Sequence, residues 1–173
     1  MPAERYVDMN GFRARYLEAG ETGPPVVLIH GLGASAEIWS ANIGPLSARH
    51  RVYVPDLPGF GRTGMTPSMD FTPAAYSRFI TDFMDALCIG RAALVGHSLG
   101  GGVALRVILD APDRVERLVL ASSAGLGHDV SLPLRIASLP LFDRVFFEGM
   151  NEIYPTRPPT PAISTTIVAI RAK

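Results

Sequence analysis

The sequence predicts an α/β fold with a mostly parallel sheet and flanking helices, on three observations. Short apolar runs rich in branched side chains recur up to Ala121, as expected of strands buried on both faces. Segments with helical spacing separate the runs, and this alternation is typical of a parallel sheet with right-handed crossovers. A glycine-rich turn joins one run to the following helix. After Ala121 no further strand-helix-strand unit is legible, so the C-terminal strands of such a sheet are predicted to be missing.

The chain begins with the pattern of a β-hairpin. Residues 6–17 alternate apolar and polar side chains on both sides of Asn10 and Gly11. An Asn-Gly pair is a strong hairpin signal, because both residues accept the left-handed backbone of a tight turn. We expect two antiparallel edge strands from this segment.

Four later segments are expected to form the other strands. Their apolar side chains are continuous rather than alternating, which indicates burial on both faces of a sheet covered by helices. These segments are Val26–Ile29, Val52–Val54, Ala92–Val95 and Val115–Ala121.

Two helices are predicted between these strands. Apolar side chains recur every three or four residues from Thr72 to Leu87, and Thr72 followed by Pro73 suits an N-cap and a first helical turn. A second helix should run from Leu99 to about Leu109, because a proline follows shortly after and disfavours helix in the residue before it.

The turn into the second helix carries a candidate nucleophile. Residues 96–100 read Gly-His-Ser-Leu-Gly, which matches the G-x-S-x-G nucleophile elbow between a buried strand and a helix. Glycines at 96 and 100 remove the side chains that would collide in so sharp a turn. Ser98 would then lie at a helix N-terminus, where unpaired amides favour developing negative charge. We therefore predict that Ser98 is a nucleophile rather than an incidental serine in a turn.

The loop after the first parallel strand, His30–Gly33, is the second candidate element. Acyl transfer needs two hydrogen-bond donors aimed at the carbonyl oxygen as it becomes an oxyanion. We assign these donors to the backbone amides of Leu32 and Leu99, so the side chains there are free to be leucine. His30 can be interpreted as a catalytic base, but we favour a ring that braces the loop through hydrogen bonds.

A third element, Asp56–Gly61, follows the next parallel strand. Asp56 is a candidate triad acid, but an aspartate before proline and glycine also organises a turn by accepting backbone hydrogen bonds. We favour the turn, because no histidine is expected near Asp56 in this topology.

Together these three elements resemble the α/β-hydrolase family, in the branch that holds esterases, lipases, C–C bond hydrolases, perhydrolases and epoxide or haloalkane hydrolases. The resemblance covers about residues 5–125, the N-terminal portion of that fold. It implies the nucleophile at Ser98 and the oxyanion amides at Leu32 and Leu99, with no metal or organic cofactor. Epoxide and haloalkane hydrolases are expected to carry aspartate at position 98, so serine there indicates an esterase- or lipase-like member.

A general base for Ser98 is harder to find. In that family the triad acid and then the histidine follow the nucleophile, on loops after the last strands. His128 is the only histidine after Ser98. A contracted triad with Asp129 is one hypothesis, although adjacent residues are badly placed to act as a base and its orienting acid. The simpler interpretation is a core at residues 1–125 and a partial cap or lid at residues 126–173.

The expected function is hydrolysis of carboxylic esters or related acyl compounds through an acyl-enzyme on Ser98. The chain alone is expected to be a weak catalyst, because it offers no convincing base. The alternative is a catalytically silent fragment that binds a small apolar ligand or a protein partner. A sheet that ended at Val115–Ala121 would also leave an apolar edge open to self-association.

Composition limits which classes of partner the protein binds and indicates the cellular compartment. Sixteen basic and sixteen acidic residues balance, so no overall field favours nucleic acid or an anionic membrane. Charged residues interrupt the first twenty positions, which argues against a signal peptide and for a cytoplasmic location. No stretch is apolar for long enough to span a bilayer. Cys88 is the only cysteine, so no internal disulfide or cysteine-based metal cluster is expected. The expected partner is a small apolar ester or acyl substrate.

Overall fold

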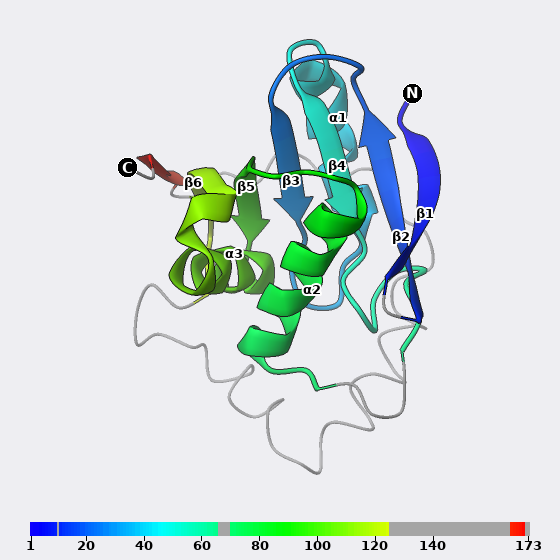
Figure 1. The fold of residues 1–173 in the computed structure, drawn as a ribbon. Helices are drawn as coiled ribbons and strands as arrows, with labels where there is room; N and C mark the ends of the chain where they lie inside the picture. The colour runs from blue at the N-terminus through cyan, green and yellow to red at the C-terminus, as the bar shows by residue number, and fades with distance from the viewer. Residues whose placement is uncertain (10, 66–69, 125–166, 172–173) are drawn as a thin grey trace.

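A computed structural model of the chain describes residues 1–9, 11–65, 70–124 and 167–171. Within these ranges seven strands form one sheet in the order β1-β2-β4-β3-β5-β6-β7 (Figure 1). The strands are β1 (Ala3–Met9), β2 (Phe12–Ala19), β3 (Pro25–Ile29), β4 (Arg51–Pro55), β5 (Ala92–His97), β6 (Val115–Ala121) and β7 (Ile167–Arg171).

The centre of the sheet is parallel, as predicted. Strands β4, β3, β5 and β6 pair in parallel, so their carboxyl ends lie along the same edge of the sheet (Figure 1). The N-terminal hairpin is confirmed, since β1 and β2 pair antiparallel from Ala3 opposite Glu18 to Met9 opposite Phe12. Of the two hairpin strands only β1 lies at an edge of the sheet, however, because β2 also pairs with β4.

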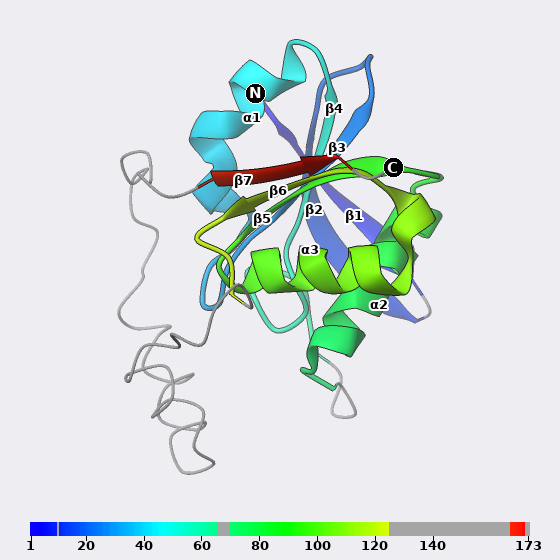
Figure 2. The ribbon, with the colours of Figure 1, turned by 90° about the vertical axis from the view of Figure 1, so that its left-hand side faces the viewer.

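Helices cover both faces of the sheet (Figure 2). On one face lie α2 (Pro73–Ala86) and α3 (Leu99–Asp110), which confirm the two predicted helices. The Thr72 hydroxyl caps α2 by accepting a 3.3 Å hydrogen bond from the Ala75 amide. On the other face lie a short 3₁₀ helix, η1 (Ala36–Trp39), and α1 (Ser40–Ser47). A second 3₁₀ helix, η2 (Pro112–Arg114), leads into β6.

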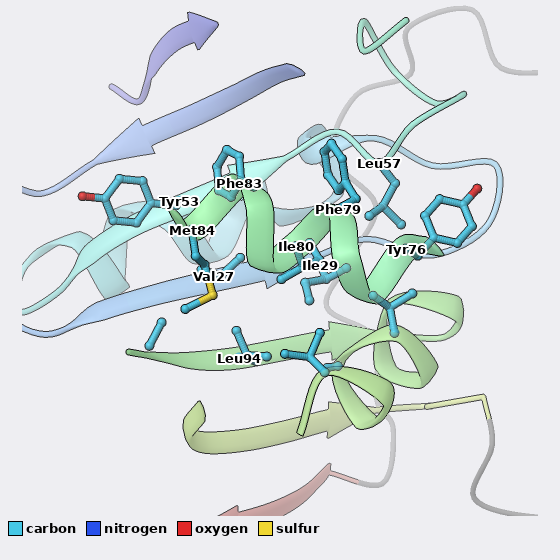
Figure 3. Close-up of a cluster of buried hydrophobic side chains, with 14 of the residues drawn as sticks. Val27, Ile29, Tyr53, Leu57, Tyr76, Phe79, Ile80, Phe83, Met84 and Leu94 are labelled. Carbon is cyan, nitrogen blue, oxygen red and sulfur yellow. The ribbon is translucent and has the colours of Figure 1, made fainter. Parts of the chain in front are cut away.

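The larger apolar core lies between the sheet and α2 and α3. Side chains at helical spacing on α2 pack against side chains of the central strands (Figure 3). Phe83 is fully buried there, and its ring meets that of Tyr16 edge-on with centroids 5.3 Å apart. A smaller core between the sheet and α1 includes Leu28, Trp39 and Ile43. The two cores hold the parallel strands, and therefore the loops at their carboxyl ends, in a fixed arrangement.

The predicted free edge at Val115–Ala121 is wrong, because β7 pairs antiparallel with β6 over its whole length. Branched side chains at positions 167, 168 and 170 favour a strand, but the segment follows a proline-rich stretch and has no neighbouring unit that would mark it. Self-association through a sheet edge stays a prediction. Residues 125–166, with most of the predicted cap, lie outside the described ranges. No helix in the described ranges is long and apolar enough to cross a membrane.

The packing of α2 on the sheet gives a stability prediction. Phe83→Ala should lower the free energy of unfolding by about 3–5 kcal/mol, because it removes a fully buried ring and leaves a cavity. Urea denaturation followed by circular dichroism measures the change. Leu109→Ala on α3 is the control, since Leu109 is 76% exposed and should change stability by less than about 0.5 kcal/mol. Equal effects of the two substitutions would contradict this account of the core.

Candidate active site

Ser98 occupies the sharp turn between β5 and α3. Its backbone φ of 52° and ψ of −118° lie in a region that residues other than glycine rarely adopt. Such a backbone costs about 1–3 kcal/mol and persists only when its surroundings hold it. Here the Ser98 amide donates to the Ala121 carbonyl at 3.1 Å, and its carbonyl accepts from the Gly101 and Ala124 amides at 3.0 and 2.9 Å. Hydrogen bonds from α3 and from the loop after β6 thus fix the serine in this turn.

Close packing of β5 against α3 explains the glycines around Ser98. A Cβ on Gly96 would lie 2.3 Å from the Gly100 carbonyl oxygen, and a Cβ on Gly100 would lie 2.3 Å from the Ile29 carbonyl oxygen. Both neighbours are backbone atoms that cannot move aside. The geometry is that of the strand-to-helix elbow which the sequence indicated, with Ser98 at its tip.

The loop after β3 approaches this turn closely. A Cβ on Gly31 would lie 3.0 Å from Ser98 Cβ, so the backbone beside Leu32 runs directly against the serine. In the described part of the chain, neither the Leu32 amide nor the Leu99 amide donates a hydrogen bond. Leu99 is the first residue of α3, where helix geometry leaves amides without an internal partner. The structure therefore brings Ser98 together with both predicted donor residues, each carrying a free N–H group.

His30 braces the loop, as the sequence analysis favoured. Its Nε2 accepts a 2.9 Å hydrogen bond from the Leu57 amide, so the ring proton is on Nδ1, which donates to the Gly31 carbonyl at 2.8 Å. The ring is fully buried, and burial lowers the pKa of His30 despite the opposing effects of the Gly31 carbonyl and of Asp56. Both nitrogens are engaged, which leaves no lone pair to accept a proton from Ser98.

The hydrogen bonds to Gly31 also orient the Leu32 amide. The Gly31 carbonyl accepts from His30 Nδ1 and from the Ala34 amide at 3.3 Å. A trans peptide is planar, so the Gly31 carbonyl and the Leu32 N–H point in opposite directions. Holding the carbonyl on one side therefore keeps the Leu32 N–H directed to the other side.

Asp56 organises two turns, which confirms the structural interpretation of this residue. Its Oδ1 accepts from the Ala36 amide at 2.7 Å, and its Oδ2 accepts from the Arg62 amide at 2.9 Å and from Arg15 Nη1 at 3.1 Å. The expectation that no histidine lies near Asp56 is wrong, since His30 Nε2 accepts a 2.9 Å hydrogen bond from the amide of Leu57, the next residue in the chain. The oxygens of Asp56 are nevertheless occupied by backbone amides and by Arg15, so it is not an orienting acid for a histidine ring.

The buried cation that accompanies Asp56 was not predicted from the sequence. Arg15 is only 2% exposed, on β2, and its guanidinium contacts Asp56, Glu37 and Glu4. In a strand whose side chains alternate between polar and apolar, an arginine is expected to face solvent. Its three carboxylate partners come from distant parts of the sequence, so they are recognisable only in the folded chain. Asp56 accepts a hydrogen bond from the Ala36 amide, so this cluster holds the C-terminal end of the loop after β3. His30 holds the N-terminal end of the same loop.

No described histidine is placed to act as a base for Ser98. His50 lies in the turn between α1 and β4, where its Nδ1 contacts the Leu46 carbonyl at 3.2 Å, and this turn is at the opposite edge of the sheet from the elbow. His97 precedes Ser98, and its Nδ1 has no hydrogen-bond partner among the described residues. His128 lies outside the described residues, so its candidacy stays a prediction. Within those residues no three His, Cys, Asp or Glu side chains are grouped to bind a metal ion.

Comparison with known proteins gives a consistent family. The family model described as alpha/beta hydrolase fold matches residues 24–156. The chain is 42% identical over 137 residues to 2-hydroxy-6-oxo-6-(2'-aminophenyl)hexa-2,4-dienoic acid hydrolase of Metapseudomonas resinovorans, covering 76% of this chain and 46% of that protein. It is 38% identical over 130 residues to the dihydrolipoyllysine-residue acetyltransferase component of an acetoin cleaving system of Cupriavidus necator, covering 75% and 34%.

A solved structure supports the same comparison. The meta-cleavage product hydrolase of Pseudomonas fluorescens has a TM-score of 0.71 and 36% identity, over 76% of this chain and 49% of that one. The chain spans about a third to a half of the length of the curated relatives named here.

The ion cluster around Arg15 predicts a dependence of stability on pH. Burial alone would raise the pKa of Glu37, but hydrogen bonds and charge from Arg15 outweigh it and lower the pKa to about 2. A carboxyl with a lowered folded-state pKa stabilises the fold above its unfolded value and loses that contribution as pH falls through the folded value. The stability that Glu37 contributes should therefore be present above about pH 4.5 and decline toward pH 2.

The measurement compares urea unfolding of the parent protein and Glu37→Gln from pH 6 downward. The parent should be more stable at pH 6 by on the order of 1 kcal/mol, because Glu37 is partly exposed and solvent screens the pair. The difference should shrink as the pH falls. Glu21→Gln, at an exposed position, is the control and should leave the curve unchanged. A difference that grows on acidification would contradict the ion-pair explanation.

Proposed function

Because the chain belongs to the α/β-hydrolase fold family, we propose that it carries the nucleophile and oxyanion donors of a hydrolase acting on carboxylic esters or related acyl compounds. The observation that supports this proposal most directly is the position of Ser98. A serine in a strained strand-to-helix turn lies beside two backbone amides that have no hydrogen-bond partner within the described residues.

The proposed reaction runs through an acyl-enzyme. Ser98 Oγ loses its proton to a general base and attacks the substrate carbonyl, whose oxygen becomes the oxyanion bound by the Leu32 and Leu99 amides. The tetrahedral intermediate collapses with loss of the protonated leaving group. Water then attacks the acyl-enzyme and releases the acid. Since none of the described histidines suits this work, the base is proposed to come from residues outside the described ranges.

A C–C bond hydrolase is a second candidate, favoured by relatives whose names specify hydroxy-oxo-dienoic acid substrates. A serine beside an oxyanion site can attack a ketone as well as an ester, so the described residues suit both chemistries. Parallel assays with an aryl ester and with 2-hydroxy-6-oxo-6-phenylhexa-2,4-dienoate separate them. Turnover of the dienoate alone would overturn the ester assignment and leave the role of Ser98 intact.

The silent-fragment alternative is tested by the reactivity of Ser98. A fluorophosphonate probe should label this serine, because the probe's phosphoryl oxygen uses the same two amides as an ester's carbonyl oxygen. Peptide mapping should find the label at Ser98, and Ser98→Ala should abolish both labelling and ester turnover. Ser40→Ala, at an exposed serine on α1, is the matched control and should change neither. Labelling spread over other serines, or undiminished in Ser98→Ala, would refute the nucleophile.

Two substitutions at Leu32 separate its side chain from its amide. Leu32→Ala should change the rate by less than about tenfold and alter the preferred acyl chain, since the side chain is partly exposed and the donor is main chain. Leu32→Pro removes the N–H and should cost roughly a hundred- to a thousandfold in kcat. Turnover of acetyl and hexanoyl aryl esters, with circular dichroism to confirm folding, measures both. A folded Leu32→Pro protein with an unchanged kcat would exclude this donor.

A further inference from the structure

His97 lies next to the proposed nucleophile, and the reaction described above gives it no part. It is the last residue of β5, where β5 pairs with β3 on one side and, through His97 opposite Ala121, with β6 on the other. Its ring is half-buried. A polar ring at the centre of the sheet and one residue from a reactive serine calls for a physical explanation.

The direction of the ring follows from the alternation of side chains along β5. A Cβ on Gly96 would point into α3, 2.3 Å from the Gly100 carbonyl oxygen. Successive side chains on a strand point to opposite faces of the sheet. The His97 side chain therefore lies on the face away from α3, and it does not share the N-terminal end of α3 with Ser98.

On that face the ring meets the loop that carries Leu32. A Cβ on Gly31 would lie 3.1 Å from His97 Nδ1 and 3.0 Å from Ser98 Cβ. The ring and the proposed nucleophile thus both border the space in front of the Gly31 Cα, where any other residue would carry its Cβ. The separation between Ser98 and the Gly31–Leu32 peptide depends on how closely this glycine can approach both.

The ring nitrogen at this contact is not used for hydrogen bonding. His97 Nδ1 is buried and has no hydrogen-bond partner among the described residues. Burial also lowers the pKa of His97, which favours a neutral ring at neutral pH. A buried polar atom without a partner costs about 1–3 kcal/mol, so packing of the ring rather than a hydrogen bond is what this position contributes.

We propose that His97 is a positioning residue, whose ring packs against Gly31 and so sets the distance between the Gly31–Leu32 peptide and Ser98. The proposal rests on the oxyanion role assigned to the Leu32 amide under the proposed function. Hydrogen bonds from His30 and Ala34 fix the direction of that peptide, and the ring of His97 fixes how near it comes to the serine. Displacing a donor by about 1 Å can cost on the order of a hundredfold in rate, so such support affects catalysis.

Two substitutions at His97 test the support directly. His97→Ala removes the ring, while His97→Phe keeps a ring of similar size without the nitrogens. In His97→Ala the Ala34 amide, which closes the loop on the Gly31 carbonyl, should exchange its hydrogen about tenfold faster by NMR. Fluorophosphonate labelling of Ser98 should slow by about ten- to a hundredfold. His97→Phe should restore both rates to within about threefold of the parent.

His50→Ala is the control for loss of an imidazole, because His50 lies before β4, at the end of the parallel strands opposite to Ser98.

A double-substitution cycle tests the contact with Gly31. Gly31→Ala adds a methyl group against the ring, which should slow Ser98 labelling by itself. His97→Ala removes Nδ1, one of the close neighbours of the added methyl group, while Ser98 Cβ stays in place. Gly31→Ala should therefore slow labelling by a smaller factor in the His97→Ala background than in the parent. In a substrate assay the loss in His97→Ala should fall on kcat with KM nearly unchanged.

The outcomes separate this inference from the proposed function. If Ser98 is labelled in the parent but His97→Ala leaves Ala34 exchange and labelling unchanged, His97 has no positioning role. A His97→Phe protein as impaired as His97→Ala would overturn a role based on packing. If no variant labels at Ser98, the proposed nucleophile fails, while Ala34 exchange still decides whether His97 supports the loop. Independent effects of Gly31→Ala and His97→Ala would exclude the contact.

Discussion

The close approach of β5 to the start of α3 is the constraint on which the rest of the site depends. Backbone atoms of Gly96, Gly100 and Ile29 come so near one another that no Cβ fits at either glycine. This contact forces the chain to reverse within one residue, and Ser98 takes the left-handed backbone that the reversal requires. The position of Ser98 at the tip of the turn and the free amide of Leu99 at the start of α3 accompany this close approach.

The loop after β3, residues 30–36, is held by buried polar groups at both of its ends. His30 holds the start through Leu57 and Gly31, and Asp56 holds the Ala36 amide at the end. The buried Asp56 side chain has a buried cation beside it, since Arg15 Nη1 lies 3.1 Å from its Oδ2. Burial of these charges makes the hydrogen bonds directional and strong, while removal of one partner would leave another unsatisfied. The loop is therefore held by the fold before any substrate arrives.

Most of the fold could be predicted from the sequence, because its strands and helices carry strong local patterns. The apolar runs, the Asn-Gly hairpin and the spacing along α2 each determine an element without reference to distant residues. The segment of η1 and α1 is different, since Pro45 lies inside α1 and Ile43 is the one fully buried side chain of that helix. Strand β7 was missed for a related reason, because it pairs with β6 across a long intervening segment. Long-range pairing leaves little signal in a single sequence.

The site divides in the same way between local and distant determinants. Ser98, Leu32 and Leu99 could be named as candidates because motifs mark the turns that carry them, whereas Arg15 and the contact between His97 and Gly31 exist only in the folded chain. The proposed donors are main-chain groups, so Leu32 and Leu99 can vary in side chain with the substrate while the anchors at His30 and Asp56 cannot. A base on a separate element would then meet the proposed nucleophile and the proposed donors already in place. In the proposed mechanism, folding of the parallel sheet places the serine and the two amides in the geometry that the reaction needs, so little further ordering of these groups is required when substrate binds.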